Sequence, residues 1–158
     1  MGLDIRSKNG LHLRMGYGDF HWMRGEVLET MHRGFGTFYE WSTAGYSGNL
    51  WGIKCNYTEA TEDEGRVYDF PFDIRPAAFS STCNELLGTW MKENGFSFAW
   101  RHFFCHSDFG GKLTASQCKR LIKDLDRMPS PSKYGIVFAA FYRIVCKAAE
   151  QNETLYFS

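Results

Sequence analysis

The sequence has no excess of charge of either sign, since eighteen Lys and Arg residues balance eighteen Asp and Glu residues. Proteins that bind duplex DNA or a membrane surface without specificity usually carry a basic excess, because their partner is a dense array of negative charge. The balance therefore argues against both partners. The charges are segregated along the chain, with residues 57–73 mainly acidic and residues 101–147 mainly basic. We expect an anionic ligand to bind in the basic half.

Long apolar runs and paired cysteines are also missing. No stretch approaches the ~18 apolar residues of a membrane span, and the first residues contain no apolar run of signal-peptide length. The cysteines are odd in number and show no C-x-x-C spacing, which is typical of free thiols in a reducing compartment. They are Cys55, Cys83, Cys105, Cys118 and Cys146. We therefore expect a soluble cytoplasmic protein.

The motifs of the common enzyme classes are absent. The chain contains no H-E-x-x-H, no G-x-S-x-G, no Walker loop and no Rossmann glycine spacing. Three potential metal ligands, His102, Cys105 and His106, lie close in sequence, but on an extended strand Cys105 would point away from the two histidines. We therefore expect no metal, no cofactor and no catalytic residue.

Aromatic residues, by contrast, are abundant. The chain has 14 Phe, 8 Tyr and 5 Trp, more than a small core readily buries. Some of them should lie at an interface or line a pocket, because rigid amphipathic rings contribute most to binding there. This excess favours a homo-oligomer.

Two segments repeat a Gly-Tyr pair followed by Trp five residues after the Tyr. Tyr17 and Trp22 belong to the first, and Tyr46, Ser47 and Trp51 to the second. Glycines let backbone amides approach a ligand, and the rings offer flat faces for stacking on a planar group such as a nucleobase. The alternative interpretation is a pair of turns with core aromatics.

Residues 101–112 form a second candidate site, which contains Arg101, His106, Asp108, Gly110, Gly111 and Lys112. The Gly-Gly-Lys loop before a helix that begins near Thr114 would offer backbone amides, a positive helix end and a cation to a phosphate or carboxylate. The alternative interpretation is a strand that ends in a turn stabilised by Asp108.

At 158 residues the chain has the length of a single domain, residues 1–158. Apolar periodicity, Asn-Gly and Gly-Gly turn signals and capping boxes at Thr82 and Thr114 predict an α+β fold with a small antiparallel sheet and three to four helices. Asp19 is a candidate N-cap for the first helix. The predicted helices cover residues 20–31, 82–93, 114–127 and 134–149. The predicted strands are a hairpin of 3–6 and 11–15, then 51–55, 66–72, 98–104 and 154–157, with an exposed loop over 59–65.

The opening Met1 to Ile5, the turn Gly45 to Gly48 followed by Trp51, and Ser107-Asp108 with Gly111 together resemble an uncharacterised family of small bacterial and phage proteins. The chain departs from that pattern where Gly52 stands in place of an Arg after Trp51. The resemblance implies a phage or bacterial cytoplasmic origin. It supplies neither an activity nor site residues.

These observations predict a non-catalytic protein that captures a small anionic, base-containing ligand. In a phage, such a protein would serve as an anti-defence sponge that sequesters a nucleotide immune signal. One alternative is a phosphodiesterase-type hydrolase using His21, His106 and Asp108. Another is a protein-binding inhibitor that uses exposed aromatics as hot spots.

Overall fold

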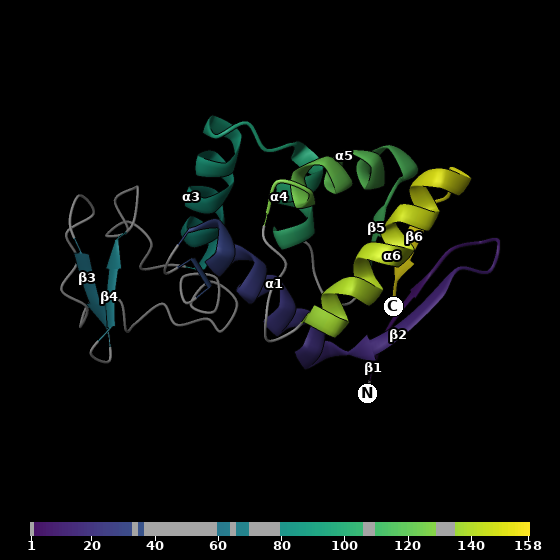
Figure 1. The fold of residues 1–158 in the computed structure, drawn as a ribbon, viewed down its shortest axis with the longest axis horizontal. Helices are drawn as coiled ribbons and strands as arrows, with labels where there is room; N and C mark the ends of the chain where they lie inside the picture. Colours follow the sequence, from purple (N-terminus) through teal and green to yellow (C-terminus); the bar gives the residue numbers. More distant parts are fainter. Residues whose placement is uncertain are drawn as a thin grey trace.

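The computed structural model describes residues 2–32, 35–36, 60–63, 66–69, 80–105, 110–128 and 135–158. Its main sheet is antiparallel and has the strand order β2-β1-β6-β5, so the first and last strands of the chain lie side by side (Figure 1). The strands are β1 (Gly2–Arg6), β2 (His12–Gly16), β5 (Gly111–Leu113) and β6 (Leu155–Phe157). Together with the helices, this sheet confirms the predicted α+β class.

The N-terminal hairpin forms as the Asn-Gly signal predicts. Leu3 to Arg6 pair with Met15 to His12, and the connecting loop is closed by a hydrogen bond from the Ser7 amide to the Leu11 carbonyl at 2.9 Å. Gly10 has a φ of +101°, a conformation that a residue with a side chain rarely adopts. The Ser7 hydroxyl also accepts a hydrogen bond from the Leu11 amide at 3.0 Å.

Five helices lie in the described part of the chain, one more than the upper end of the predicted range. They are α1 (Tyr17–Met31), α3 (Ser80–Glu93), α4 (Phe98–Cys105), α5 (Ala115–Leu125) and α6 (Gly135–Gln151). None of these described helices has both the length and the apolar character needed to span a membrane.

Two predicted helix starts were wrong. α1 begins directly after strand β2, with Gly16 as its N-cap, so Asp19 lies inside the first turn. α3 begins at Ser80, which places Thr82 within the helix instead of before it. In both cases the polar residue read as a cap is tolerated in a first turn, where backbone amides have no partner within the helix.

The predicted strand over residues 98–104 was also wrong, because this segment forms helix α4. Ser97 provides the start signal: its hydroxyl accepts a hydrogen bond from the Trp100 amide and donates one to the buried Asp124 carboxylate. Ala99, Trp100 and Phe103 are buried, which is the spacing of one helical face and not of alternating strand positions. The aromatic composition predicted a strand, but the Ser97 cap and the helical spacing of the buried residues favour a helix.

A further correction concerns residues 59–65, which we predicted as a loop. Strand β3 (Ala60–Asp63) pairs there with β4 (Arg66–Asp69) in a separate two-stranded sheet. The acidic composition of 60–63 is unusual for a strand, and pairing with an adjacent partner outweighs such weak propensities. β4 matches the first part of the strand predicted over 66–72, whereas the strand predicted over 51–55 lies outside the described residues.

The core lies between the inner face of the main sheet and helices α1 and α6, which pack against the sheet and against each other (Figure 1). Phe20 of α1 is fully buried and lies at its centre. Its ring centroid lies 5.9 Å from Phe103 of α4, 5.6 Å from Phe141 of α6 and 5.9 Å from Phe157 of β6. Pairs of this kind add about 0.5–1.5 kcal/mol each beyond the apolar area they bury.

Helix α5 begins at a complete capping box, as predicted. The Thr114 hydroxyl accepts from the Gln117 amide at 3.2 Å, and the Gln117 side chain accepts from the Thr114 amide at 2.9 Å. We expect Thr114→Ala to lower the free energy of unfolding by about 0.5–2 kcal/mol, because an N-terminal amide loses its partner. Chemical denaturation measures this change. Ser116→Ala, an exposed position in the same first turn, is the control and should change stability by less than Thr114→Ala. Equal effects of the two variants would contradict the role of the cap.

Candidate functional site

The outer face of the main sheet carries a row of exposed side chains that runs across all four strands. Lys112 on β5 lies opposite Tyr156 on β6, Tyr156 opposite Arg6 on β1, and Arg6 opposite His12 on β2. We call these four residues the outer row. Each of them is exposed, while the neighbours Ile5, Leu113 and Phe157 are buried on the inner face. The row follows from the period of two, which sends successive side chains to opposite faces of a strand.

Tyr156 is the aromatic member of the row. It is 39% exposed although its strand lies inside the sheet, with β1 on one side and β5 on the other. In the register of the sheet, Arg6 and Lys112 flank it. Neighbouring strands are ~4.8 Å apart, so a cation lies on either side of the phenol ring within reach of one small ligand.

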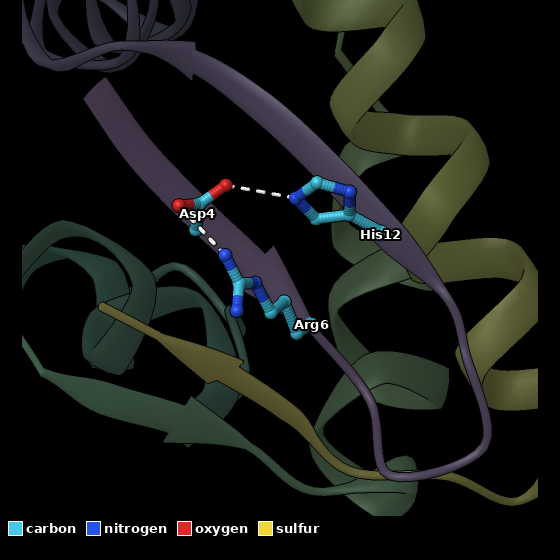
Figure 2. Close-up of polar contacts among 3 residues, drawn as sticks. All are labelled: Asp4, Arg6 and His12. Carbon is cyan, nitrogen blue, oxygen red and sulfur yellow. Dashed lines mark hydrogen bonds and ion pairs between the residues drawn. The ribbon is translucent and has the colours of Figure 1, made fainter.

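Asp4 contacts two members of the row (Figure 2). One carboxylate oxygen lies 3.0 Å from Arg6 Nη2, and the other lies 2.8 Å from His12 Nε2. The hydrogen bond from His12 is the largest cause that lowers the pKa of Asp4, and the positive charges of Arg6 and Arg14 add to it. Asp4 is therefore ionised at neutral pH and forms an ion pair with the exposed Arg6 guanidinium.

Helix α4 lies next to the β5 end of the row. His102 Nε2 donates a hydrogen bond to the Lys112 carbonyl at 3.1 Å, and its ring stacks on Phe98 at a centroid distance of 6.0 Å. Phe98 is 57% exposed. Phe98 and His102 are four residues apart, so they lie on the same face of helix α4. The hydrogen bond from His102 places this pair of rings beside the Lys112 backbone.

A pocket of about 230 Å³ opens beside Tyr156. The residues that line it come from the hairpin loop and from the segment that joins α6 to β6: Lys8, Asn9, Asn152, Glu153, Thr154 and Tyr156. Asn152 turns the chain at the end of α6 with a φ of 58°, and the Glu153 amide donates to the Ala148 carbonyl at 2.8 Å. This is the Schellman arrangement, in which a left-handed residue ends the helix and its last carbonyls find partners.

The first predicted aromatic segment does not form a turn. Gly16 ends β2, and Tyr17 and Trp22 both lie in α1. Five residues along a helix place two side chains about 140° apart, so the two rings do not share one surface. Tyr17 packs against the core, while Trp22 is 45% exposed and lies edge-on to His21.

Several other predicted residues fall outside the described part of the chain: Tyr46, Ser47, Trp51, His106 and Asp108. Arg101 lies in α4. Gly110 has a φ of +78° and leads into β5, which contains Gly111 and Lys112. Gly111 and Lys112 therefore belong to an edge strand, and Lys112 joins the outer row.

The start of α5 offers fewer free amides than the predicted anion loop would need. The amides of Thr114 and Gln117 are both occupied by the capping box. An anion site at this helix start remains a prediction. The position of Lys112 opposite Tyr156 is given by the register of the sheet.

The thiols that the structure describes do not suit nucleophilic chemistry. Burial raises the pKa of Cys118 to about 12, and burial also raises the pKa of Cys146. Both are free cysteines, as predicted. Among the described residues no three His, Cys, Asp or Glu side chains gather in a way that would hold a metal ion.

Comparison of the chain with protein-family models, with curated proteins and with solved structures finds no match. The resemblance to a family of small phage and bacterial proteins therefore remains a prediction. The candidate site is therefore supported by the geometry of the outer row and its neighbours alone.

Sequence reasoning missed Arg6, Tyr156 and the residues of the pocket. The alternation of residues 3–6 and the predicted strand 154–157 were available signals, and they assign the outward positions correctly. The missing information was that β6 inserts between β1 and β5, and its pairing with β1 spans most of the chain length.

The link between His12 and Asp4 gives a test by titration. Because the folded state lowers the pKa of Asp4, the ionised carboxylate stabilises the fold above its unfolded value of 3.8, and this contribution is lost as the pH falls through the lower, folded value. We expect His12→Ala to raise the pKa of Asp4, measured by NMR titration of the carboxyl carbon. Lys92→Ala on α3 is the control. An unchanged Asp4 pKa in the His12 variant would contradict the assignment.

Proposed function

We propose that the outer face of the main sheet binds a small anionic ligand that contains a planar base, without changing it chemically. The observation that supports this function best is the outer row, in which a partly exposed tyrosine lies between an arginine and a lysine. This proposal keeps the predicted ligand class and assigns it to the sheet, while the second Gly-Tyr segment lies outside the described residues.

The chemistry of the row suits such a ligand. The Tyr156 ring offers a face for stacking, which is worth about 1–3 kcal/mol per base. Arg6 and Lys112 lie in register on either side of Tyr156 and would neutralise a phosphate with charge-assisted hydrogen bonds. The Asp4 carboxylate lies 3.0 Å from the exposed Arg6 guanidinium, so a bound phosphate would share this cation with Asp4.

Among the groups near the row, His12 bears on whether the ligand is turned over. His12 is hydrogen-bonded to Asp4 at 2.8 Å, a pairing that would also orient a general base, so the hydrolase alternative is decided by the turnover measurement. A protein that holds a nucleotide unchanged acts by lowering its free concentration. In a phage this would silence a nucleotide immune signal of the host cytoplasm.

Substitutions in the row should weaken the binding of nucleoside monophosphates and dinucleotides. Tyr156→Leu removes the stacking surface, and we expect a loss of about 5- to 150-fold in affinity. Arg6→Gln and Lys112→Gln remove charge-assisted contacts and should also make the remaining binding less dependent on salt. Isothermal titration calorimetry measures each affinity.

The matched control is Lys147→Gln, an exposed lysine of α6, a helix that packs against the sheet from its inner side. It should leave the affinity unchanged. Wild-type affinity in all three row variants would remove the outer face as the site. Native mass spectrometry of the recovered nucleotide distinguishes binding from hydrolysis, because a hydrolase would release a product of different mass.

A further inference from the structure

Two cations of the outer row lie on opposite sides of Tyr156. Arg6 on β1 and Lys112 on β5 each pair with Tyr156 in the register of the sheet. Side chains directly opposite each other on neighbouring antiparallel strands have their Cβ atoms about 4.5–5.5 Å apart, so the Cβ atoms of Arg6 and Lys112 are about 10 Å apart. All three side chains are exposed, and that of Arg6 is 59% exposed. A ligand on the outer face can therefore reach each of them.

A base that stacks on Tyr156 lies between the two cations. Both cations could reach a single phosphate only if that phosphate lay over the middle of the row, at the place of the base. Stacking on Tyr156 and a phosphate shared by Arg6 and Lys112 therefore exclude each other. With the base in place, each cation is left on its own side of it, where it can form charge-assisted hydrogen bonds to a separate phosphate.

The Asp4 carboxylate also favours an Arg6 guanidinium on its own side of the row. Asp4 precedes Arg6 by two residues on β1, so the two side chains share the outer face. Figure 2 shows the guanidinium directed toward Asp4, with Nη2 at 3.0 Å from the carboxylate. An exposed ion pair of this kind is weak, and a phosphate can share the guanidinium with Asp4. Its direction along β1 nevertheless opposes convergence of Arg6 with Lys112.

The positions of the phosphates distinguish classes of nucleotide. A nucleoside carries its 5′ and 3′ oxygens on opposite sides of the sugar. Nucleoside diphosphates and triphosphates have all their phosphates on the 5′ side. A nucleoside phosphorylated at both oxygens has one phosphate on each side, and this pattern matches a stacking residue with one cation on either side.

We propose that the outer row binds a nucleoside that carries a phosphate on both its 5′ and its 3′ oxygen. The base stacks on Tyr156, and Arg6 and Lys112 each bind one phosphate. This proposal rests on the proposed nucleotide-binding function and adds the arrangement of the phosphates. The same chemistry occurs in a free nucleoside 3′,5′-bisphosphate and in an internal nucleotide of a short oligonucleotide.

The test compares adenosine 3′,5′-bisphosphate (pAp) with ADP and ATP, by calorimetry on the full chain without divalent cations. ADP has the same base and the same number of phosphates, and ATP has nearly the same charge as pAp, but both carry their phosphates on one side. We expect pAp to bind ~5-fold more tightly than either, which is the upper range for one additional exposed ion pair. It should exceed 5′-AMP and 3′-AMP by at least as much.

Variants of the row locate the two phosphates. Arg6→Gln and Lys112→Gln each leave one cation beside Tyr156, and each should bring the affinity for pAp close to that for ADP. Both should lower the affinity for 5′-AMP less, because a monophosphate needs one cation only. Arg14→Gln is the matched control, since it removes a positive charge from an exposed position on β2 opposite Asp4, outside the row. It should keep the preference for pAp. Thermal unfolding of each variant verifies that the fold is retained.

Two oligonucleotides distinguish the two sources of this chemistry. The trinucleotide ApApA has a middle nucleoside with a phosphate on each side, whereas the dinucleotide ApA has none. Tighter binding of ApApA than of ApA, together with the preference for pAp over ADP, assigns the site to an internal nucleotide of an oligonucleotide. A preference for pAp without this difference assigns it to a free bisphosphate.

The outcomes separate this proposal from the proposed function. Equal binding of pAp, ADP and ATP by the wild-type chain would overturn recognition of phosphates on both sides and leave the proposed function in place. Binding of none of the nucleotides would overturn both. A preference for pAp that persists in both Arg6→Gln and Lys112→Gln, or that Arg14→Gln removes equally, would overturn the assignment of the two cations.

Discussion

The contact of Phe20 with three other rings is the constraint on which the rest of the structure depends. Through Phe103, Phe141 and Phe157 it joins α1 to α4, α6 and the last strand. Because Phe157 packs in this cluster, the register of strand β6 is fixed. A slip by one residue would turn every side chain of the strand to the opposite face of the sheet. Tyr156 must then lie on the outer face. The candidate site is thus a consequence of how the core packs.

Local signals in the sequence predicted much of the fold, because they act over a few residues. The Asn-Gly hairpin, the capping box of α5 and the terminal strand all appear close to their predicted positions. α4 was missed because the aromatic residues from Phe98 onward resemble a strand, and the cap that decides for a helix depends on Asp124, 27 residues further along the chain. The pairing of β6 with β1 and β5 is also non-local, and no local pattern encodes it.

The site was only partly predictable for the same reason. Lys112 was identified as a ligand cation from its neighbouring glycines, and the structure adds its register with Tyr156. Arg6 looked like an ordinary outward position of a hairpin, and its relation to Asp4 and Tyr156 emerges from the assembled sheet. Glu153 carried no signal, since its burial depends on the turn at Asn152 and on the packing of the strand that follows.

The most direct test of the account is to map where a nucleotide binds, by following backbone amide shifts in NMR spectra while 5′-AMP is added. The account predicts that the largest changes occur in β1, in β5 and β6, and in the hairpin loop around Lys8, with small changes in the exposed part of α1 around Trp22. Changes centred on α1, or spread evenly over the molecule, would contradict a site on the outer face of the sheet.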